Sequence, residues 1–189
     1  AGNGVNKYLR SNRLNNDDPQ DNVHLSVYIT NNNSFIGNGS VLGAGVGALG
    51  TTRITPINLD GAIVLARYNG STLSLSGAEP INFIGVTRSS SSEYEGRMNG
   101  VVGTISDTSA TPGPTSIDVF RSYSGAYADS TLAFYSIGES LDLEKLDNRV
   151  SRFMAENKFF LNTGLSGKDY DIDTLNYINA GYENGGSIG

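Results

Sequence analysis

The chain has 189 residues, a formal net charge of −6, 17% charged residues and no cysteine. This length is enough to bury one sizeable core, and the missing cysteine excludes disulfides, thiol nucleophiles and thiolate metal centres. The acidic balance, without any Lys/Arg cluster, argues against nucleic acid and against an anionic membrane surface as partners. No run of about 20 apolar residues indicates a transmembrane helix.

The middle of the chain has the pattern of a series of short β-strands. Leu25, Val27 and Ile29 alternate with polar residues that include His24, which indicates a strand with one buried and one solvated face. Many short strands separated by glycine-rich turns are typical of an antiparallel sandwich. The predicted strands cover residues 24–30, 40–50, 62–68, 71–76, 81–88, 93–98, 101–106, 117–123 and 131–137.

Three features mark the turns between these strands. Asn69-Gly70 and Asn99-Gly100 are the preferred pair for a type I′ turn, so each predicts a tight hairpin. The run Thr111-Pro112-Gly113-Pro114 excludes a central strand at that position, because proline cannot donate to a sheet ladder.

The apolar period changes from 2 to 3.6 after Gly138. Apolar residues then recur on one face of a helix, at Leu143, Leu146, Val150 and Phe153. We expect this helix over residues 141–157, packed across an open end or an edge of the sandwich, and a second short helix over residues 172–182. The predicted domain is a sandwich over residues 1–158 that includes the closing helix. Residues 159–189 would be a linker or helical connector to a further module.

Three stretches together carry a family resemblance. In residues 7–20 a polar loop leads into the strand from His24. In residues 83–100 a strand that ends in Arg-Ser is followed by a serine loop and by a strand that ends in Asn-Gly. Residues 132–143 match a last strand and the helix after it. Over residues 6–157 the chain resembles the concanavalin A-like, laminin G-like modules of tailed-phage and prophage structural proteins. The resemblance implies a jelly-roll sandwich on a virion surface or otherwise outside the cell.

No catalytic residue is predicted. Relatives of this fold that hydrolyse polysaccharides carry Glu-x-Asp-x-x-Glu on one strand, whereas residues 139–144 have a different spacing and begin a helix, where acids suit the helix dipole. Glu93 and Glu95 share a strand face, but Arg97 continues it as an ionic stripe. A Ser-His-Asp triad would depend on His24, the only histidine, which we expect to be an exposed or hydrogen-bonded strand residue.

One loop is rich in oxygen ligands. Asp17, Asp18 and Asp21, with Asn16, could ligate a hard cation such as Ca²⁺, which takes six to eight oxygens. Laminin G-like relatives often carry one calcium. The alternative is that an Asx-rich loop serves turn formation alone. We predict no other cofactor.

A candidate glycan site lies beside the last strand. Tyr123 and Tyr127 flank a short loop, with Arg121 and Asp129 close in sequence. Aromatic rings stack on the apolar faces of sugars, and neighbouring polar groups bind hydroxyls. The alternative is that these tyrosines only cover a sheet face.

The sequence therefore predicts a non-catalytic structural module of a virion appendage, such as a tail, a fibre or a head decoration. Its partners would be other virion proteins or further copies of itself. The alternative is a lectin-like module that binds a cell-surface glycan for attachment. A polysaccharide hydrolase is the third hypothesis.

Overall fold

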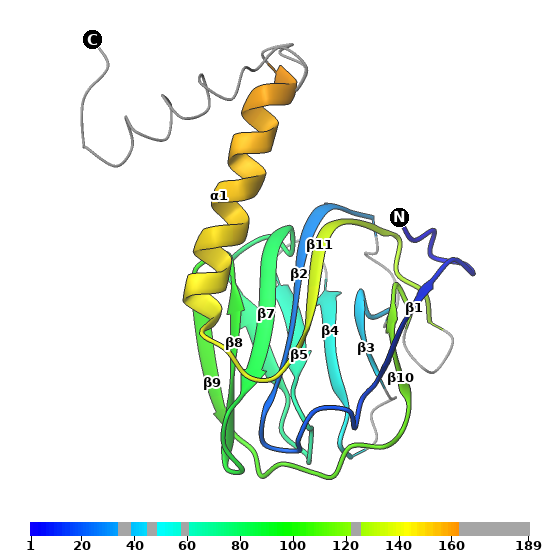
Figure 1. Cartoon of the computed structure of the whole chain (residues 1–189), viewed down its shortest axis with the longest axis vertical. Coiled ribbons are helices and arrows are strands. Elements are labelled where there is room, and N and C mark those ends of the chain that lie inside the picture. Colours follow the sequence, from blue (N-terminus) through cyan, green and yellow to red (C-terminus); the bar gives the residue numbers. More distant parts are fainter. Residues whose placement is uncertain (34–38, 45–48, 58–60, 122–125, 163–189) are drawn as a thin grey trace, which may run out of the picture. The chain divides into compact units, whose positions relative to one another are not determined.

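The computed structural model describes residues 1–33, 39–44, 49–57, 61–121 and 126–162, with side chains described up to residue 156. These residues form two antiparallel sheets (Figure 1). Sheet A has the strand order β1-β10-β3-β4-β5-β6, and sheet B has the order β11-β2-β7-β8-β9. The strands of sheet A are β1 (Leu9–Leu14), β10 (Ser116–Val119), β3 (Leu42–Ala44), β4 (Thr52–Ile57), β5 (Gly61–Leu65) and β6 (Leu73–Ser76). The strands of sheet B are β11 (Ser130–Gly138), β2 (Val23–Asn32), β7 (Asn82–Arg88), β8 (Glu93–Met98) and β9 (Val101–Ser106).

The apolar faces of the two sheets enclose one core. Leu25, Val27 and Ile29 of β2 are fully buried there, as the alternation predicts. Ile54 of β4 and Val64 of β5 contribute from sheet A. The predicted all-β antiparallel sandwich is confirmed.

The other face of β2 is also buried from His24 to Tyr28, so the prediction of a solvated face is wrong for that part of the strand, whereas Thr30 is exposed. His24 is only 4% exposed, Ser26 is fully buried and Tyr28 is 5% exposed. The first part of helix α1 (Leu143–Asn162) covers sheet B here: a Cβ added to Gly85 of β7 would lie 2.8 Å from a methyl carbon of Leu143. A second small apolar layer therefore lies on the outer face of sheet B.

Helix α1 begins at Leu143, two residues after the predicted start. Asp142 caps it, since its carboxylate accepts the backbone N–H of Lys145 at 3.0 Å. Asp147 then accepts a hydrogen bond from Nε of Arg97 at 2.8 Å, which ties the second turn to β8. Leu143 and Val150 are buried. This start of the helix is thus an integral part of the sandwich.

The two Asn-Gly pairs have different outcomes. Asn99 and Gly100 have φ values of 48° and 83°, and the register closes directly on Met98 and Val101, so the tight β8–β9 hairpin is confirmed. The antiparallel pairing of β5 with β6 is confirmed, but the predicted tight turn at Asn69-Gly70 is wrong, because β5 ends at Leu65 and β6 begins at Leu73. Hydrogen bonds fix this longer connection in place of a tight turn. In one of them, the N–H of Asn69 donates to the carboxylate of Asp107 at 2.9 Å.

Other bounds also differ from the prediction. Strand β4 was missed, since its sequence does not alternate and contains Pro56. Strand β10 ends at Val119 rather than at residue 123, because Phe120 has a φ of 66°. Residues 45–48, predicted as part of a strand, and the predicted helix over residues 172–182 lie outside the described residues.

The chain divides into two compact units, Ala1–Ser151 and Arg152–Gly189. In the described start of the second unit, α1 continues to Asn162 rather than ending at residue 157. Arg152 and Glu156 form an i,i+4 ion pair there, with Nε 2.8 Å from Oε1.

Candidate functional site

Two tyrosines and an arginine from separate segments meet beyond the end of β10. Tyr8 immediately precedes β1, whereas Arg121 and Tyr127 form an isolated antiparallel bridge. The guanidinium carbon of Arg121 lies 3.5 Å from the centroid of the Tyr8 ring. The Tyr8 and Tyr127 rings have centroids 6.2 Å apart and are tilted by 48°. With Asp118 of β10, these residues are the Tyr8 cluster.

Asp118 fixes the guanidinium in this position. Nε of Arg121 donates to Oδ2 of Asp118 at 2.9 Å, and Nη2 donates to the same oxygen. Burial lowers the pKa of Arg121, but the hydrogen bond and the charge of Asp118 outweigh it, so the pKa is raised overall. The Arg121 side chain is 20% exposed, and that of Asp118 is 6% exposed. The cluster thus presents a partly accessible cation backed by a buried carboxylate.

One oxygen of Asp118 has no partner among the described residues. Oδ1 is buried and makes no hydrogen bond to any of them. A buried carboxylate oxygen without a donor costs free energy, and such atoms are uncommon in folded proteins. The buried end of the cluster is therefore under-satisfied, and a bound water or ion is one arrangement that would complete it.

The local backbone explains how the cluster forms. The left-handed Phe120 turns the chain out of β10. Gly39 then permits a close approach, since a Cβ there would lie 2.5 Å from the carbonyl oxygen of Tyr127. The N-terminal arm comes alongside, with the N–H of Gly2 donating to Ser130 at 2.9 Å. These backbone contacts bring the start of β1 to the end of β10.

The structure brings together part of the predicted glycan site. Arg121 and Tyr127 lie in one cluster, as predicted, while Tyr123 lies outside the described residues. The carboxylate that pairs with Arg121 is that of Asp118 rather than Asp129. The prediction also missed Tyr8, which lies far away in sequence.

The carboxylates of the predicted calcium loop have separate partners. Asp18 pairs with Arg13, whose Nε donates to it at 3.1 Å, and Asp17 accepts the N–H of Leu14 at 2.7 Å. Asp21 accepts a hydrogen bond from the hydroxyl of Ser109. Across the described ranges, no group of three or more His, Cys, Asp or Glu side chains is arranged to hold a metal ion.

The same loop nevertheless surrounds a cation, the guanidinium of Arg67. Nη1 of Arg67 donates to the side-chain oxygen of Asn15 at 2.6 Å and also to its carbonyl oxygen. Nη2 donates to the carbonyl oxygen of Asp18 at 2.9 Å. Arg67 is fully buried, and burial lowers its pKa to about 10, so it stays protonated at neutral pH. The oxygen-rich loop therefore binds a cation from its own chain.

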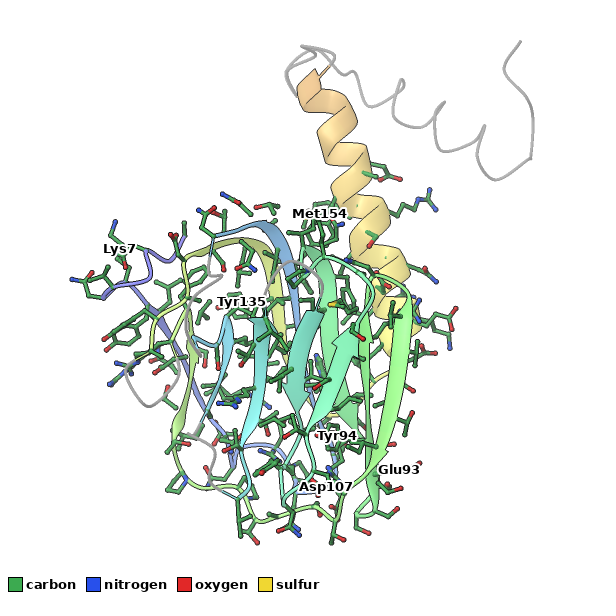
Figure 2. The ribbon with its side chains drawn as sticks, turned by 180° about the vertical axis from the view of Figure 1, so that it is seen from behind. Lys7, Glu93, Tyr94, Asp107, Tyr135 and Met154 are labelled. Carbon is green, nitrogen blue, oxygen red and sulfur yellow. The ribbon has the colours of Figure 1, made fainter. Side chains whose placement is uncertain are left out.

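A second buried arginine lies at the same end of the sandwich. Nε of Arg88 donates to the carbonyl oxygen of Ala66 at 2.8 Å, and Nη1 donates to that of Asp107 at 2.9 Å. Its guanidinium carbon lies 5.0 Å from the ring centroid of Tyr94. Tyr94 and Asp107 lie near each other in Figure 2. These contacts join β7 and β8 to the segments that follow β5 and β9, and they serve stability.

His24 has a structural position. Nδ1 lies 2.6 Å from the carbonyl oxygen of Glu139, and Nε2 lies 2.7 Å from the hydroxyl of Ser136. A carbonyl can only accept, so Nδ1 carries the proton and Nε2 accepts from the serine. Burial lowers the pKa of His24. Both ring nitrogens are thus engaged in holding the end of β11.

The ionic stripe on β8, formed by Glu93, Glu95 and Arg97, is only partly solvated. Glu93 is exposed, whereas Glu95 and Arg97 are half-buried. Arg97 is engaged by Asp147 of α1. Arg97, the cation that shares this face with Glu93 and Glu95, therefore belongs to the contact between β8 and α1.

Comparison of the sequence with protein-family models and with curated proteins gives no match. Within the described part of the chain, no helix is long and apolar enough to cross a membrane.

Proposed function

We propose that this chain is a non-catalytic recognition module of a larger surface protein, and that it binds carbohydrate at the Tyr8 cluster. One observation carries the proposal: Tyr8, Arg121 and Tyr127 converge from separate segments, with the guanidinium 3.5 Å from the Tyr8 ring centroid. Aromatic rings, a guanidinium and a carboxylate are the groups that recognise sugar rings and their hydroxyls. The under-satisfied Asp118 supports a polar ligand.

The contacts of the candidate catalytic groups support a non-catalytic role. His24 uses both ring nitrogens in hydrogen bonds to the end of β11 and the residue after it. Arg97, on the face that carries Glu93 and Glu95, belongs to the contact with α1. The concanavalin A-like, jelly-roll connectivity that the sequence resemblance implies is part of the same proposal.

A glycan array tests the proposal, followed by calorimetry with the best ligand in the presence and absence of Ca²⁺. The Tyr127→Ala variant should bind about tenfold more weakly or worse, because a stacking surface is lost. Tyr135→Ala is the matched control, since Tyr135 is a 44% exposed tyrosine on β11, outside the cluster. A failure to bind any glycan would overturn the proposal, and so would equal weakening by the two substitutions.

A structural role in a virion appendage is the second candidate. The sequence resemblance implies this role. The structural observation that favours it is strand β9, an edge strand of sheet B to which another strand could pair. Such a module would lie on the virion surface and contact other virion proteins or further copies of itself. Immunolabelling of purified particles tests this role, and particles that lack the protein would exclude it.

A further inference from the structure

Among the described residues, strand β9 forms an unpaired and regular edge of sheet B. Figure 1 shows it at the margin of the sheet, and its six residues pair with β8 without any register shift. The sequence of β9 is Val-Val-Gly-Thr-Ile-Ser, which contains neither charge nor proline. An edge of this kind can template the addition of another strand.

The hydrogen-bonding groups of this edge can be assigned from the turn. The two-residue turn closes on Met98 and Val101, so hydrogen-bonded pairs alternate from that pair along the hairpin. Val101 and every second residue after it bond to β8. Val102, Thr104 and Ser106 consequently direct their N–H and C=O groups outward. The side chains of these three residues are exposed.

The other sheet edges are protected in recognisable ways. Strand β1 carries Arg10 and Arg13 and has an irregular register around Asn12, whose φ is 59°. Strand β11 has register shifts, and the N–H of Gly2 bonds to Ser130 at one end. Strand β6 has only four residues. Short length, charge, bulges and coverage all hinder strand addition, and among the described edges β9 has none of them.

We propose that β9 pairs antiparallel with β9 of a second copy and forms a symmetric dimer with one continuous sheet. Placing Thr104 on the two-fold axis sets it opposite Thr104 of the second copy, and Val102 opposite Ser106 of the second copy. All three residues with outward backbone groups then lie in hydrogen-bonded pairs. A two-fold contact requires such a self-complementary surface.

The charged residues of β8 lie one strand away from the proposed junction. On β8, Arg97 lies beside Val102 and Glu93 lies beside Ser106. The dimer places Arg97 and Glu93 of the second copy in the same cross-strand row, separated by the two β9 strands. The central row holds two threonines, which pair favourably across strands, between Glu95 of one copy and Glu95 of the second copy. No like charges directly oppose each other at the junction.

Sedimentation velocity over a range of concentrations tests the proposal on the full chain. The wild-type protein should dimerise, and Thr104→Lys should raise the dissociation constant by roughly tenfold or more, because two like charges would face each other on the axis. Ser74→Lys is the matched control, since Ser74 is an exposed, uncharged residue on the edge strand of the other sheet. Both variants should keep the wild-type melting temperature at concentrations where the wild-type protein is monomeric.

Cross-linking adds a second readout that does not depend on weakening the contact. The chain has no cysteine, so Thr104→Cys introduces one thiol on the axis, and mild oxidation should give a covalent dimer in high yield. Ser74→Cys should give much less. A wild-type protein that stays monomeric at the highest soluble concentration would overturn the proposal. Equal behaviour of the substitutions at Thr104 and Ser74 would do the same.

Discussion

Arg67 and Asn15 form a buried hydrogen bond at one end of the sandwich, with Nη1 of the arginine 2.6 Å from the side-chain oxygen of the asparagine. Arg67 is fully buried and Asn15 is 2% exposed. Because the guanidinium also donates to the carbonyl oxygens of Asn15 and Asp18, it fixes the course of the loop that leads from β1 to β2. A charged side chain thereby organises an acidic, Asx-rich segment.

Arg67→Met should destabilise the protein by about 3 kcal/mol or more. The substitution leaves several buried oxygens without donors, and each unsatisfied group costs about 1–3 kcal/mol. Arg10→Met on the exposed face of β1 is the control, and it should change the free energy of unfolding by less than about 0.5 kcal/mol. Urea denaturation measures both. A loss below about 1 kcal/mol for Arg67→Met would show that the loop holds its position without this cation.

Calcium should not alter the stability of the wild-type protein. Asp18 is paired with Arg13, Asp21 accepts from Ser109, and loop carbonyl oxygens are taken by Arg67. A cation would have to displace these partners before it could collect six or more oxygens. Thermal unfolding in EDTA and in millimolar Ca²⁺ should give the same melting temperature within about 1 °C. A calcium-dependent rise would restore the metal site predicted from the sequence.

Strands with a clear apolar alternation could be predicted from the sequence, and those held by tertiary contacts could not. Leu25, Val27 and Ile29 revealed β2 because only one periodicity buries them together. Strand β4 was not predicted, since Pro56 argues against a central strand. The proline is tolerated there because the pairing of β3 with β4 ends at Ile54. The burial of His24 could not be foreseen, because the element that covers it lies more than 100 residues away.

In the candidate site, too, residues that are close in sequence could be grouped by prediction, and a residue that is distant in sequence could not. Arg121 and Tyr127 could be grouped because they flank one short segment. Asp118 lies three residues before Arg121, a spacing that could have suggested the ion pair. Tyr8 gave no such signal, because its place beside Arg121 depends on the pairing of β1 with β10 and on the N-terminal arm.

Protein stability should fall as the pH drops below 6.5 because of His24. Burial lowers the pKa of this imidazole from its ordinary value of 6.5, so the unfolded chain takes up a proton at a higher pH than the folded chain does. The stabilisation is therefore complete above pH 6.5 and is lost as the pH falls towards the lowered folded-state pKa. Unfolding curves between pH 7.5 and 5 measure the slope, which should be smaller in His24→Gln. Equal slopes would show that other groups control the pH dependence.

Leu143→Ala should destabilise the sandwich by about 2–4 kcal/mol. Leu143 is 1% exposed and packs over Gly85 on the outer face of sheet B, so the truncation leaves a cavity there. Leu9→Ala is the matched control, because Leu9 is 58% exposed on β1. Chemical denaturation followed by far-UV circular dichroism compares the two variants. If both lose the same small amount, the start of α1 does not contribute to the stability of the sandwich.

Tyr94→Phe should cost about 1–2 kcal/mol at neutral pH. The Tyr94 hydroxyl donates to the carbonyl oxygen of Ser71 at 2.8 Å and accepts the N–H of Leu73 at 3.1 Å, so its removal leaves a buried and a partly buried group without this partner. Burial raises the pKa of Tyr94 from 10 to about 12. The unfolded chain therefore ionises first, and wild-type stability should fall as the pH rises above 10. Denaturation at pH 7, 9 and 10.5 should show a smaller alkaline loss for Tyr94→Phe, because this variant lacks the ionising group; parallel losses would contradict the assignment.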